Sequence, residues 1–219
     1  PATGVPGAAS SAVSVPTDDS GKPLYDPAVL NDGRLRVLYC DGRSGSSTTI
    51  LCGSTPLHQS TRSENVSLVE DSATGTADYW LRSWSDPTGR GGRRTALYDK
   101  TGTEVMSFEG EQSATLQNGL LGLQESRLID GGYVPESGYG TCQVIDLATG
   151  AALPVPEGAY SCTLCGDKLV FSCYARPEGL DDYDWDTDYQ QNRWVVVQEK
   201  DGTTVYRADA ASAYRLFYD

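Results

Sequence analysis

The chain has 219 residues, with 17 Lys and Arg against 30 Asp and Glu, so its net charge is −13 with the one His neutral. This length suits one domain with a tail, and it is long enough to bury a hydrophobic core without a metal or cofactor. The acidic balance argues against binding nucleic acid or an anionic membrane surface, because both need clustered positive charge. No apolar run approaches the roughly 18–20 residues that span a bilayer.

The first residues differ in composition from the rest of the chain. Residues 1–21 are almost all Ala, Gly, Pro, Ser, Thr and Val, without Lys, Arg or an aromatic residue. Such a stretch cannot bury enough surface to offset its ordering entropy, so we expect residues 1–32 to be a linker that contributes at most one strand. The tract resembles the spacer after the lipid-modified Cys of bacterial surface lipoproteins, which implies a lipid anchor upstream and an extracytoplasmic location. An ordinary inter-domain linker is the alternative.

Period-two alternation of apolar residues, which is typical of half-buried strands, recurs over residues 33–219, whereas helical periodicity is nearly absent. One example is the run 168–175, which places Leu169, Phe171 and Cys173 on the same strand face. Residues 207–213 are rich in Ala and offer a short helix as an alternative to a strand. In chain order, strands or strand-and-turn runs are expected at 35–40, 48–52, 79–84, 95–102, 103–108, 113–116, 119–123, 142–150, 151–155, 161–164, 168–175, 194–202, 203–206 and 213–218.

These runs form a repeat. The units that open at residues 95, 142 and 194 each read strand, Asp/Gly turn, strand, short link, strand, and a further strand opens the next unit; a looser copy covers 34–71. Four strands and about 40–50 residues per repeat are typical of β-propeller blades. We therefore predict an all-β fold, a β-propeller-like array of about four four-stranded antiparallel blades. A β-sandwich is the alternative.

The turns at 99–102, 146–150 and 201–202 and the run GDKL at 166–169 carry a family resemblance. They resemble bacterial extracytoplasmic β-propeller repeat proteins, whose blades have a D-x-x-G turn and a G-D-K-hydrophobic opening strand. The resemblance covers residues 33–219. Because four-bladed rings are uncommon, it implies either a larger ring of which this chain is a piece or an N-terminal strand that closes the last blade.

Six cysteines are present. Cys40 and Cys52 end two predicted strands joined by a short loop, and we predict a disulfide between them in an oxidising compartment. Cys162 and Cys165 have CxxC spacing. A zinc site usually needs a second such pair, and a redox site needs the motif at the start of a helix, so a mixture of disulfides and buried thiols is favoured over both.

The longest predicted insertion, residues 176–193, is the best candidate for a binding site. Long loops are usually functional, and those at 41–46, 85–94 and 127–141 are expected to share its face. Exposed aromatic rings beside carboxylates grip sugar rings by stacking and hydrogen bonding. The residues predicted to contact a ligand are Tyr183, Asp184, Trp185, Asp186 and Tyr189.

Alternating carboxylates in the same insertion also raise the question of a metal. Asp184, Asp186 and Asp188 could offer oxygen ligands to Ca²⁺, although the Gly and Glu of an EF-hand loop are missing. The alternatives are pairing of these carboxylates with Arg176 or Arg193, or splaying into water. We expect no other cofactor.

Other aromatic and titratable residues give weaker signals. Trp80, Trp84 and Trp194 lie in strand runs and are predicted to belong to the core. His58 lacks the flanking glycines of a nucleophile elbow and is predicted to be structural or exposed.

The sequence favours a non-enzymatic extracytoplasmic binding or scaffold module that uses a loop-built face to hold a glycan, peptide or protein partner. One alternative is a glycan-active hydrolase with paired carboxylates drawn from Glu125, Glu136, Glu178 and the acidic loop. A second alternative is a structural part of a larger propeller without a ligand of its own.

Overall fold

The computed structural model of the chain describes residues 20–21, 32–42, 45–89, 92–126, 141–175 and 192–209. Within these ranges the regular secondary-structure elements are all β-strands, which confirms the all-β prediction. No helix in the described ranges is long and apolar enough to cross a membrane. Residues 1–19 and 22–31, which hold most of the predicted linker, lie outside the described residues.

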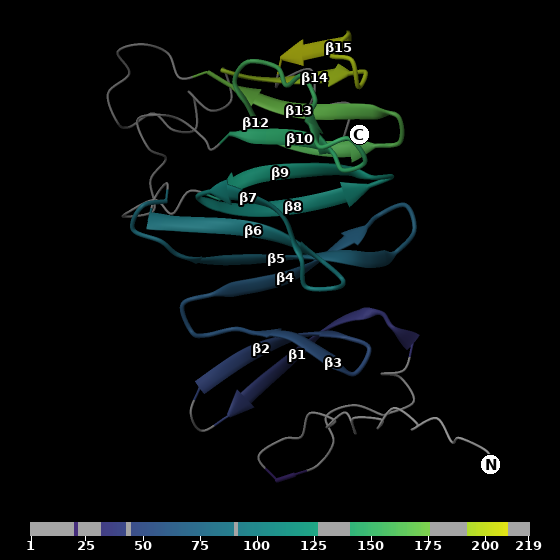
Figure 1. Cartoon of the computed structure of the whole chain (residues 1–219). Coiled ribbons are helices and arrows are strands. Elements are labelled where there is room, and N and C mark those ends of the chain that lie inside the picture. Colours follow the sequence, from purple (N-terminus) through teal and green to yellow (C-terminus); the bar gives the residue numbers. More distant parts are fainter. Residues whose placement is uncertain are drawn as a thin grey trace, which may run out of the picture.

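The strands lie in three sheets that follow one another along the molecule in chain order (Figure 1). The first is a three-stranded antiparallel sheet with the order β1-β2-β3, and the second is an eight-stranded sheet with the order β11-β10-β9-β8-β4-β5-β6-β7. The third has the order β12-β13-β14-β15. The first sheet contains β1 (Leu35–Gly42), β2 (Gly45–Cys52) and β3 (Thr55–Gln59).

The eight-stranded sheet consists of two antiparallel meanders of four strands each. A single parallel pair, Asp71 with Leu116, joins β4 to β8 where the two meanders meet. Next to it the Ser72 amide donates a 2.8 Å hydrogen bond to the Leu116 carbonyl. One meander contains β4 (Asn65–Asp71), β5 (Thr76–Ser85), β6 (Arg93–Asp99) and β7 (Glu104–Glu109), and the other β8 (Glu111–Gln117), β9 (Leu120–Ser126), β10 (Cys142–Asp146) and β11 (Ala151–Ala152).

The third sheet repeats the same plan as one more four-stranded antiparallel meander. Its strands are connected in the same order as those of the two preceding meanders. Its fourth strand, β15, has six residues like β7, whereas β11 has two. Its strands are β12 (Ala159–Cys165), β13 (Lys168–Tyr174), β14 (Arg193–Gln198) and β15 (Thr204–Asp209).

The Asp/Gly turns that define the sequence repeat join the third strand of each meander to the fourth. In the β6–β7 turn, Asp99 Oδ1 accepts hydrogen bonds from the amides of Thr101 and Thr103 at 2.8 and 3.0 Å. Gly102 follows at φ +83°, a conformation that costs a side-chain-bearing residue energy. The hydrogen bonds of the aspartate side chain and the positive φ of the glycine that follows therefore stabilise the tight turn of this hairpin.

Hydrophobic side chains fill the three seams between consecutive units. The first seam lies between the three-stranded sheet and β4–β7 and is built on Leu35, Ile50 and Trp80. The second lies between β4–β7 and β8–β11, and the third between β8–β11 and β12–β15. The second seam contains Val69, Leu81, Leu97, Leu116, Leu121, Leu123 and Ile145, and the third contains Leu120, Cys142, Val144, Ala159, Leu169, Phe171, Cys173 and Val196.

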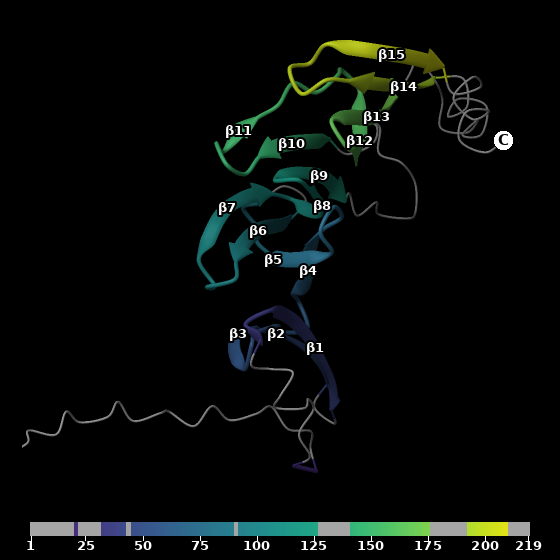
Figure 2. The ribbon, with the colours of Figure 1, turned by 90° about the vertical axis from the view of Figure 1, so that its right-hand side faces the viewer.

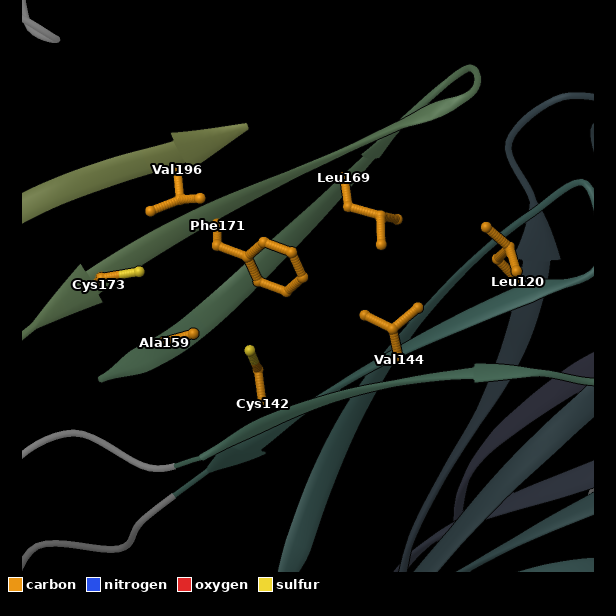
Figure 3. Close-up of a cluster of buried hydrophobic side chains, with 8 residues drawn as sticks. All are labelled: Leu120, Cys142, Val144, Ala159, Leu169, Phe171, Cys173 and Val196. Carbon is orange, nitrogen blue, oxygen red and sulfur yellow. The ribbon is translucent and has the colours of Figure 1, made fainter. Parts of the chain in front are cut away.

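In the third seam, burial alternates from one residue of β13 to the next. Leu169, Phe171 and Cys173 are all fully buried on the inward face of β13, as the sequence predicts. Figure 3 shows Phe171 pointing from β13 toward Cys142 and Val144 of β10. The side chains between them on β13 face the other way and are partly exposed.

The outer strands β7 and β15 share an irregularity. Each carries a bulge against its neighbour at the equivalent position, between Leu97 and Tyr98 on β6 and between Val197 and Gln198 on β14. Val105 and Val205, which follow the Asp/Gly turns, are exposed there at 42% and 54%. The two strands are therefore copies of one design at the edge of two different sheets.

The predicted Cys40–Cys52 disulfide is wrong. The register of the hairpin pairs Cys40 with Ser47 and Cys52 with Leu35, so the two cysteines lie near opposite ends of the ladder. Five residues along a strand span about 17 Å, whereas the Cα atoms of a disulfide are about 5.5 Å apart. Cys52 carries a free thiol, which donates a 3.3 Å hydrogen bond to the Gly33 carbonyl.

The alternative of a helix at 207–213 is also wrong in its described part. Residues 207–209 belong to β15, which pairs with β14 from Trp194 to Gln198. Backbone pairing to β14 overrides the weak helix preference of Ala208, and residues 210–213 lie outside the described residues.

Removal of the Phe171 ring is expected to destabilise the chain strongly. Phe171→Ala leaves a cavity in the third seam and should lower the free energy of unfolding by about 3–5 kcal/mol. Val205→Ala, at an exposed position of the same sheet, should change it by less than about 0.5 kcal/mol. Urea denaturation of both variants measures this, and a cost for Phe171→Ala no larger than that for Val205→Ala would contradict the described core.

The cysteines should differ in reactivity in the folded chain. Burial raises the pKa of Cys142 to about 12 and that of Cys173 to about 11, so neither forms the reactive thiolate near neutral pH. Cys165 is exposed. Iodoacetamide at about pH 8 should modify Cys165 in the native protein and the other two only after unfolding, as peptide mass spectrometry would show. Equal rates for Cys165 and Cys173 would refute this arrangement.

Candidate functional site

One edge of the molecule collects the ends of the second strands and the beginnings of the third strands of the meanders. Strands β5, β9 and β13 end there and β6, β10 and β14 begin there, at the left in Figure 1. The connections that leave this edge cover residues 86–92, 127–141 and 175–192, and they are longer than the Asp/Gly turns opposite. We call it the insertion edge. The positions of these strand ends support the expectation that the long connections begin and end at the same edge of the molecule.

The residues that the sequence singled out for ligand and calcium binding lie outside the described residues. This holds for Tyr183, Asp184, Trp185, Asp186, Asp188 and Tyr189, and for Glu136 and Glu178. Within the described ranges no group of three or more His, Cys, Asp or Glu side chains could hold a metal ion. The CxxC cysteines point away from each other, because an offset of three residues along β12 puts Cys162 and Cys165 on opposite faces.

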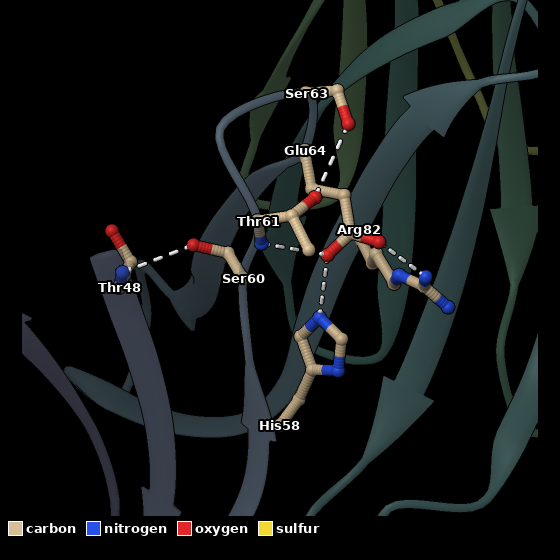
Figure 4. A network of polar contacts seen from close by, with 7 residues as sticks. All are labelled: Thr48, His58, Ser60, Thr61, Ser63, Glu64 and Arg82. Carbon is tan, nitrogen blue, oxygen red and sulfur yellow. Dashed lines mark hydrogen bonds and ion pairs between the residues drawn. The ribbon is translucent and has the colours of Figure 1, made fainter. Parts of the chain in front are cut away.

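A cluster of charged and aromatic side chains closes the first seam at the insertion edge, and we call it the Glu64 clasp (Figure 4). Glu64 lies between β3 and β4 and its side chain is 9% exposed. Its Oε2 lies 2.9 Å from His58 Nε2, and its Oε1 contacts Arg82 Nη2. The Thr61 amide donates a further hydrogen bond of 3.3 Å to Oε2. One carboxylate therefore connects β3 to β5 across the seam.

The electrostatics of the clasp favour the ionised carboxylate. Burial by itself would raise the pKa of Glu64, but the hydrogen bonds from Arg82, His58 and the Thr61 amide outweigh it and hold that pKa below its ordinary value. For Arg82, burial works against the charged form, and hydrogen bonds to Glu64 and Tyr98 again outweigh it and raise the pKa of the guanidinium. Both partners thus stay charged at neutral pH.

Aromatic rings surround the clasp. His58 stacks on Trp80 with 5.6 Å between ring centroids, and Trp80 stacks on Tyr98 at 4.4 Å. Arg82 lies over the Trp84 ring at 4.9 Å. Trp80 is buried as predicted. Trp84, the last residue but one of β5, is only partly buried. His58 is held by a carboxylate and an indole, which fits a structural role.

Arginine and glutamate also meet at the insertion end of the second seam. Arg93 Nε lies 3.0 Å from Glu111 Oε2, and Asn65 Nδ2 donates a 2.7 Å hydrogen bond to Oε1 of the same carboxylate. Behind them the hydroxyls of Ser83 and Thr95 lie 2.7 Å apart, both buried. The apolar seam thus becomes polar as it approaches this edge.

Glu125, one of the carboxylates considered for a hydrolytic pair, lies on β9. It is 6% exposed, and its Oε2 accepts a 3.2 Å hydrogen bond from the Thr141 hydroxyl. Gln112 lies directly opposite on β8.

A pocket of about 260 Å³ opens at the insertion end of β14 and β15. The Arg207 guanidinium lies over the Trp194 ring at 5.0 Å, so Trp194 contributes one part of its ring to the pocket and another to the third seam. Trp194 is therefore a partial member of the core, and the sequence did not predict its second role. The pocket is lined by Ala175, Asn192, Arg193, Trp194, Arg207 and Asp209.

Comparisons with known proteins assign no family to this chain. No family model and no curated protein matches the chain. A solved structure described as "Crystal structure of the eukaryotic initiation factor" is similar over 81% of this chain and 52% of that one, at 10% identity and a TM-score of 0.42. The chain thus spans about half the length of that protein, and its function has to be argued from its own residues.

Loss of the Glu64 carboxylate is expected to change stability in a pH-dependent way. The pKa of Glu64 is lower in the folded chain than its ordinary 4.5. The ionised clasp therefore contributes its full stabilisation of the folded chain above pH 4.5. This stabilisation is lost as the pH falls through the folded pKa. Glu64→Gln should cost about 1–3 kcal/mol at pH 7.

The matched control for the clasp is Glu70→Gln, at an exposed position of β4. Urea denaturation between about pH 3 and pH 7 should show that the difference between wild type and Glu64→Gln shrinks toward acid. A difference that stays constant over this range would show that the carboxylate charge contributes nothing.

Proposed function

We propose that the chain is a β-propeller-like binding or scaffold module without catalytic activity, which holds a glycan, peptide or protein partner on its insertion edge. The observation that carries the proposal is the threefold repetition of a four-stranded meander whose long connection leaves on the same side each time. Loops gathered on one side of a rigid scaffold are a common way to build a binding surface. The face-to-face packing of successive meanders supports the propeller-like arrangement of about four blades.

The chemistry of the edge favours binding over catalysis. Two of the described carboxylates there are engaged in fixed contacts, Glu64 with His58 and Arg82, and Glu111 with Arg93 and Asn65. Groups held in this way stiffen the edge and set its shape. A general acid or base needs a carboxyl group that is free to exchange a proton with a substrate.

An extracytoplasmic location is part of the proposal and rests on the composition of residues 1–21. The free thiol of Cys52 removes the support that a disulfide would have given. Protease accessibility on intact cells that express the full gene product tests the location. Complete protection until the cells are lysed would overturn it.

The binding role can be tested on the intact chain with glycan and peptide arrays, followed by a pair of matched substitutions. Arg94→Ala removes a 43% exposed cation from the insertion edge, and Lys100→Ala removes a 57% exposed cation from the opposite edge. For an anionic partner, Arg94→Ala should weaken binding by about two- to fivefold and Lys100→Ala should not. The reverse order would place the partner on the other edge.

A hydrolase would behave differently in the same material. The proposal expects no turnover of polysaccharides by the wild-type chain. Turnover that disappears in Glu125→Gln, with the fold intact by circular dichroism, would establish the carboxylate hydrolase in its place.

A specific observation favours a second candidate, a structural part of a larger propeller. The outward face of β12–β15 carries Val170, Val195, Val197 and Tyr206, of which Tyr206 is 43% exposed. An apolar sheet face of this kind normally packs on another sheet. Val197→Asp should then leave the chain folded and reduce its self-association in sedimentation velocity. Unfolding by Val197→Asp would show that the face is already covered within this chain.

A further inference from the structure

The β8–β9 turn, at the edge opposite the insertion edge, has a distinctive backbone conformation. Asn118 and Gly119 form its two-residue loop, because the ladder ends with the pair Gln117 and Leu120. Their φ angles of +50° and +76° match a type I′ turn, for which Asn-Gly is a preferred sequence. Among the described residues, Asn118 is the one residue other than glycine with a positive φ. Both loop residues are exposed.

This turn contacts the meanders on both sides of its own. The Asn118 amide donates a 3.3 Å hydrogen bond to Asp71 Oδ1, at the joint where Asp71 of β4 pairs with Leu116 of β8. On the other side, the Gly166 amide of the β12–β13 turn donates a 2.9 Å hydrogen bond to Gln117 Oε1. Figure 2 shows β8 and β9 between β4–β7 and β12–β15. The turn therefore connects three consecutive meanders.

Asparagine followed by glycine is chemically labile, because glycine has no side chain to hinder attack by its own amide nitrogen. In this reaction the Gly119 nitrogen bonds to Asn118 Cγ, the Cγ–Nδ2 bond breaks, and ammonia leaves with the proton of the Gly119 amide. Water then opens the succinimide ring at either carbonyl, which gives aspartate or isoaspartate. The Gly119 amide is available for this attack, because the ladder around a two-residue loop uses the amides of Gln117 and Leu120.

The folded turn holds the two reacting groups apart. Ring closure needs the Gly119 nitrogen on the same side of the Asn118 Cα–C bond as Cβ. In the left-handed conformation of Asn118, that nitrogen lies on nearly the opposite side. Rotation about this bond turns over the peptide between the two residues, which breaks the pair Gln117–Leu120 and the 2.9 Å hydrogen bond from the Leu147 amide to the Gly119 carbonyl. The reaction therefore requires the turn to open.

We propose that Asn118 is a covalent modification site, converted to aspartate and isoaspartate when the joint between the meanders opens. Isoaspartate adds one methylene to the main chain within a two-residue loop, which prevents the type I′ turn from closing again. The product also places a second carboxylate beside Asp71, and like charges repel. A chain that has opened once therefore keeps a weakened joint. The reaction needs only water and is independent of the binding role of the insertion edge.

The test is timed incubation of the intact chain at mildly alkaline pH, with and without concentrated guanidinium chloride, followed by tryptic peptide mass spectrometry. The peptide 101–127 contains Asn118 and no other asparagine, and the peptide 63–82 contains Asn65 as an internal control. Asn65 precedes Val66, whose branched side chain hinders the attack. Asn118 should convert in guanidinium chloride and at least about tenfold more slowly in the folded chain, while Asn65 stays unmodified. Equal rates for Asn118 in both conditions, or no conversion in guanidinium chloride, would overturn the proposal.

A pair of matched substitutions tests the role of the joint. Gln117→Ala removes the hydrogen bond from Gly166 and should speed conversion in the folded chain by about two- to tenfold, with the rate in guanidinium chloride unchanged. Gln124→Ala, at an exposed position of the same tryptic peptide, should change neither rate. Asn118→Gly keeps the positive φ and should abolish the mass change. A Gln117→Ala variant that converts at the wild-type rate when folded would overturn the dependence on the joint.

The consequence for the joint is measured after conversion. Wild-type chain that has been converted in guanidinium chloride and then refolded should unfold at a lower denaturant concentration than Asn118→Gly treated in the same way. Equal midpoints for the two would show that the modification leaves the joint intact, and would overturn that part of the proposal.

Discussion

Each meander in this chain has apolar side chains on both of its faces, and a sheet of this kind is stable in water only when both faces are covered. Strand β9 shows the constraint most clearly, because Leu121 and Leu123 enter the second seam and Leu120 enters the third. The same holds for β10, with Ile145 on one side and Val144 on the other. The order of the units along the molecule follows from this need, since each unit covers the one before it.

The seams are apolar along most of their length and charged where they reach the insertion edge. Arginine supplies the described cations there, and the sequence as a whole has four lysines among its 17 basic residues. Arginine suits a seam because its planar group can hydrogen-bond a carboxylate while it stacks on an aromatic ring, as Arg82 does with Glu64 and Trp84. Such pairs add little net stability but fix which surfaces meet. The edge therefore combines a defined shape with a surface rich in polar groups.

The sequence predicts the strands and turns of this fold well, and the contacts between sheets poorly. Alternation and the Asp/Gly turns are local signals, so β6–β7, β13 and β14–β15 could be placed to within a few residues. Strand β3 lacks such a signal because Pro56 interrupts its pattern. The disulfide prediction failed because loop length alone does not show which residues of a hairpin lie opposite each other.

The polar sites depend on longer-range geometry. Glu64, Arg82 and His58 meet only because two sheets pack face to face, and nothing in their sequence spacing indicates this. The pocket at Trp194 brings together residues from β14, β15 and the end of the β13 connection, which are far apart in the sequence. No local pattern indicates that they share a hollow.

The bulges on β7 and β15 bear on how the protein behaves at high concentration. An exposed outer strand presents unpaired amide and carbonyl groups that can capture the edge of another molecule and start a growing fibril. A bulge twists the strand and interrupts the regular spacing that such capture requires. The exposed Val105 and Val205 sit at these interruptions, where a foreign strand finds no continuous ladder to extend. The repeat thus carries its own protection against aggregation in each copy that ends in a full outer strand.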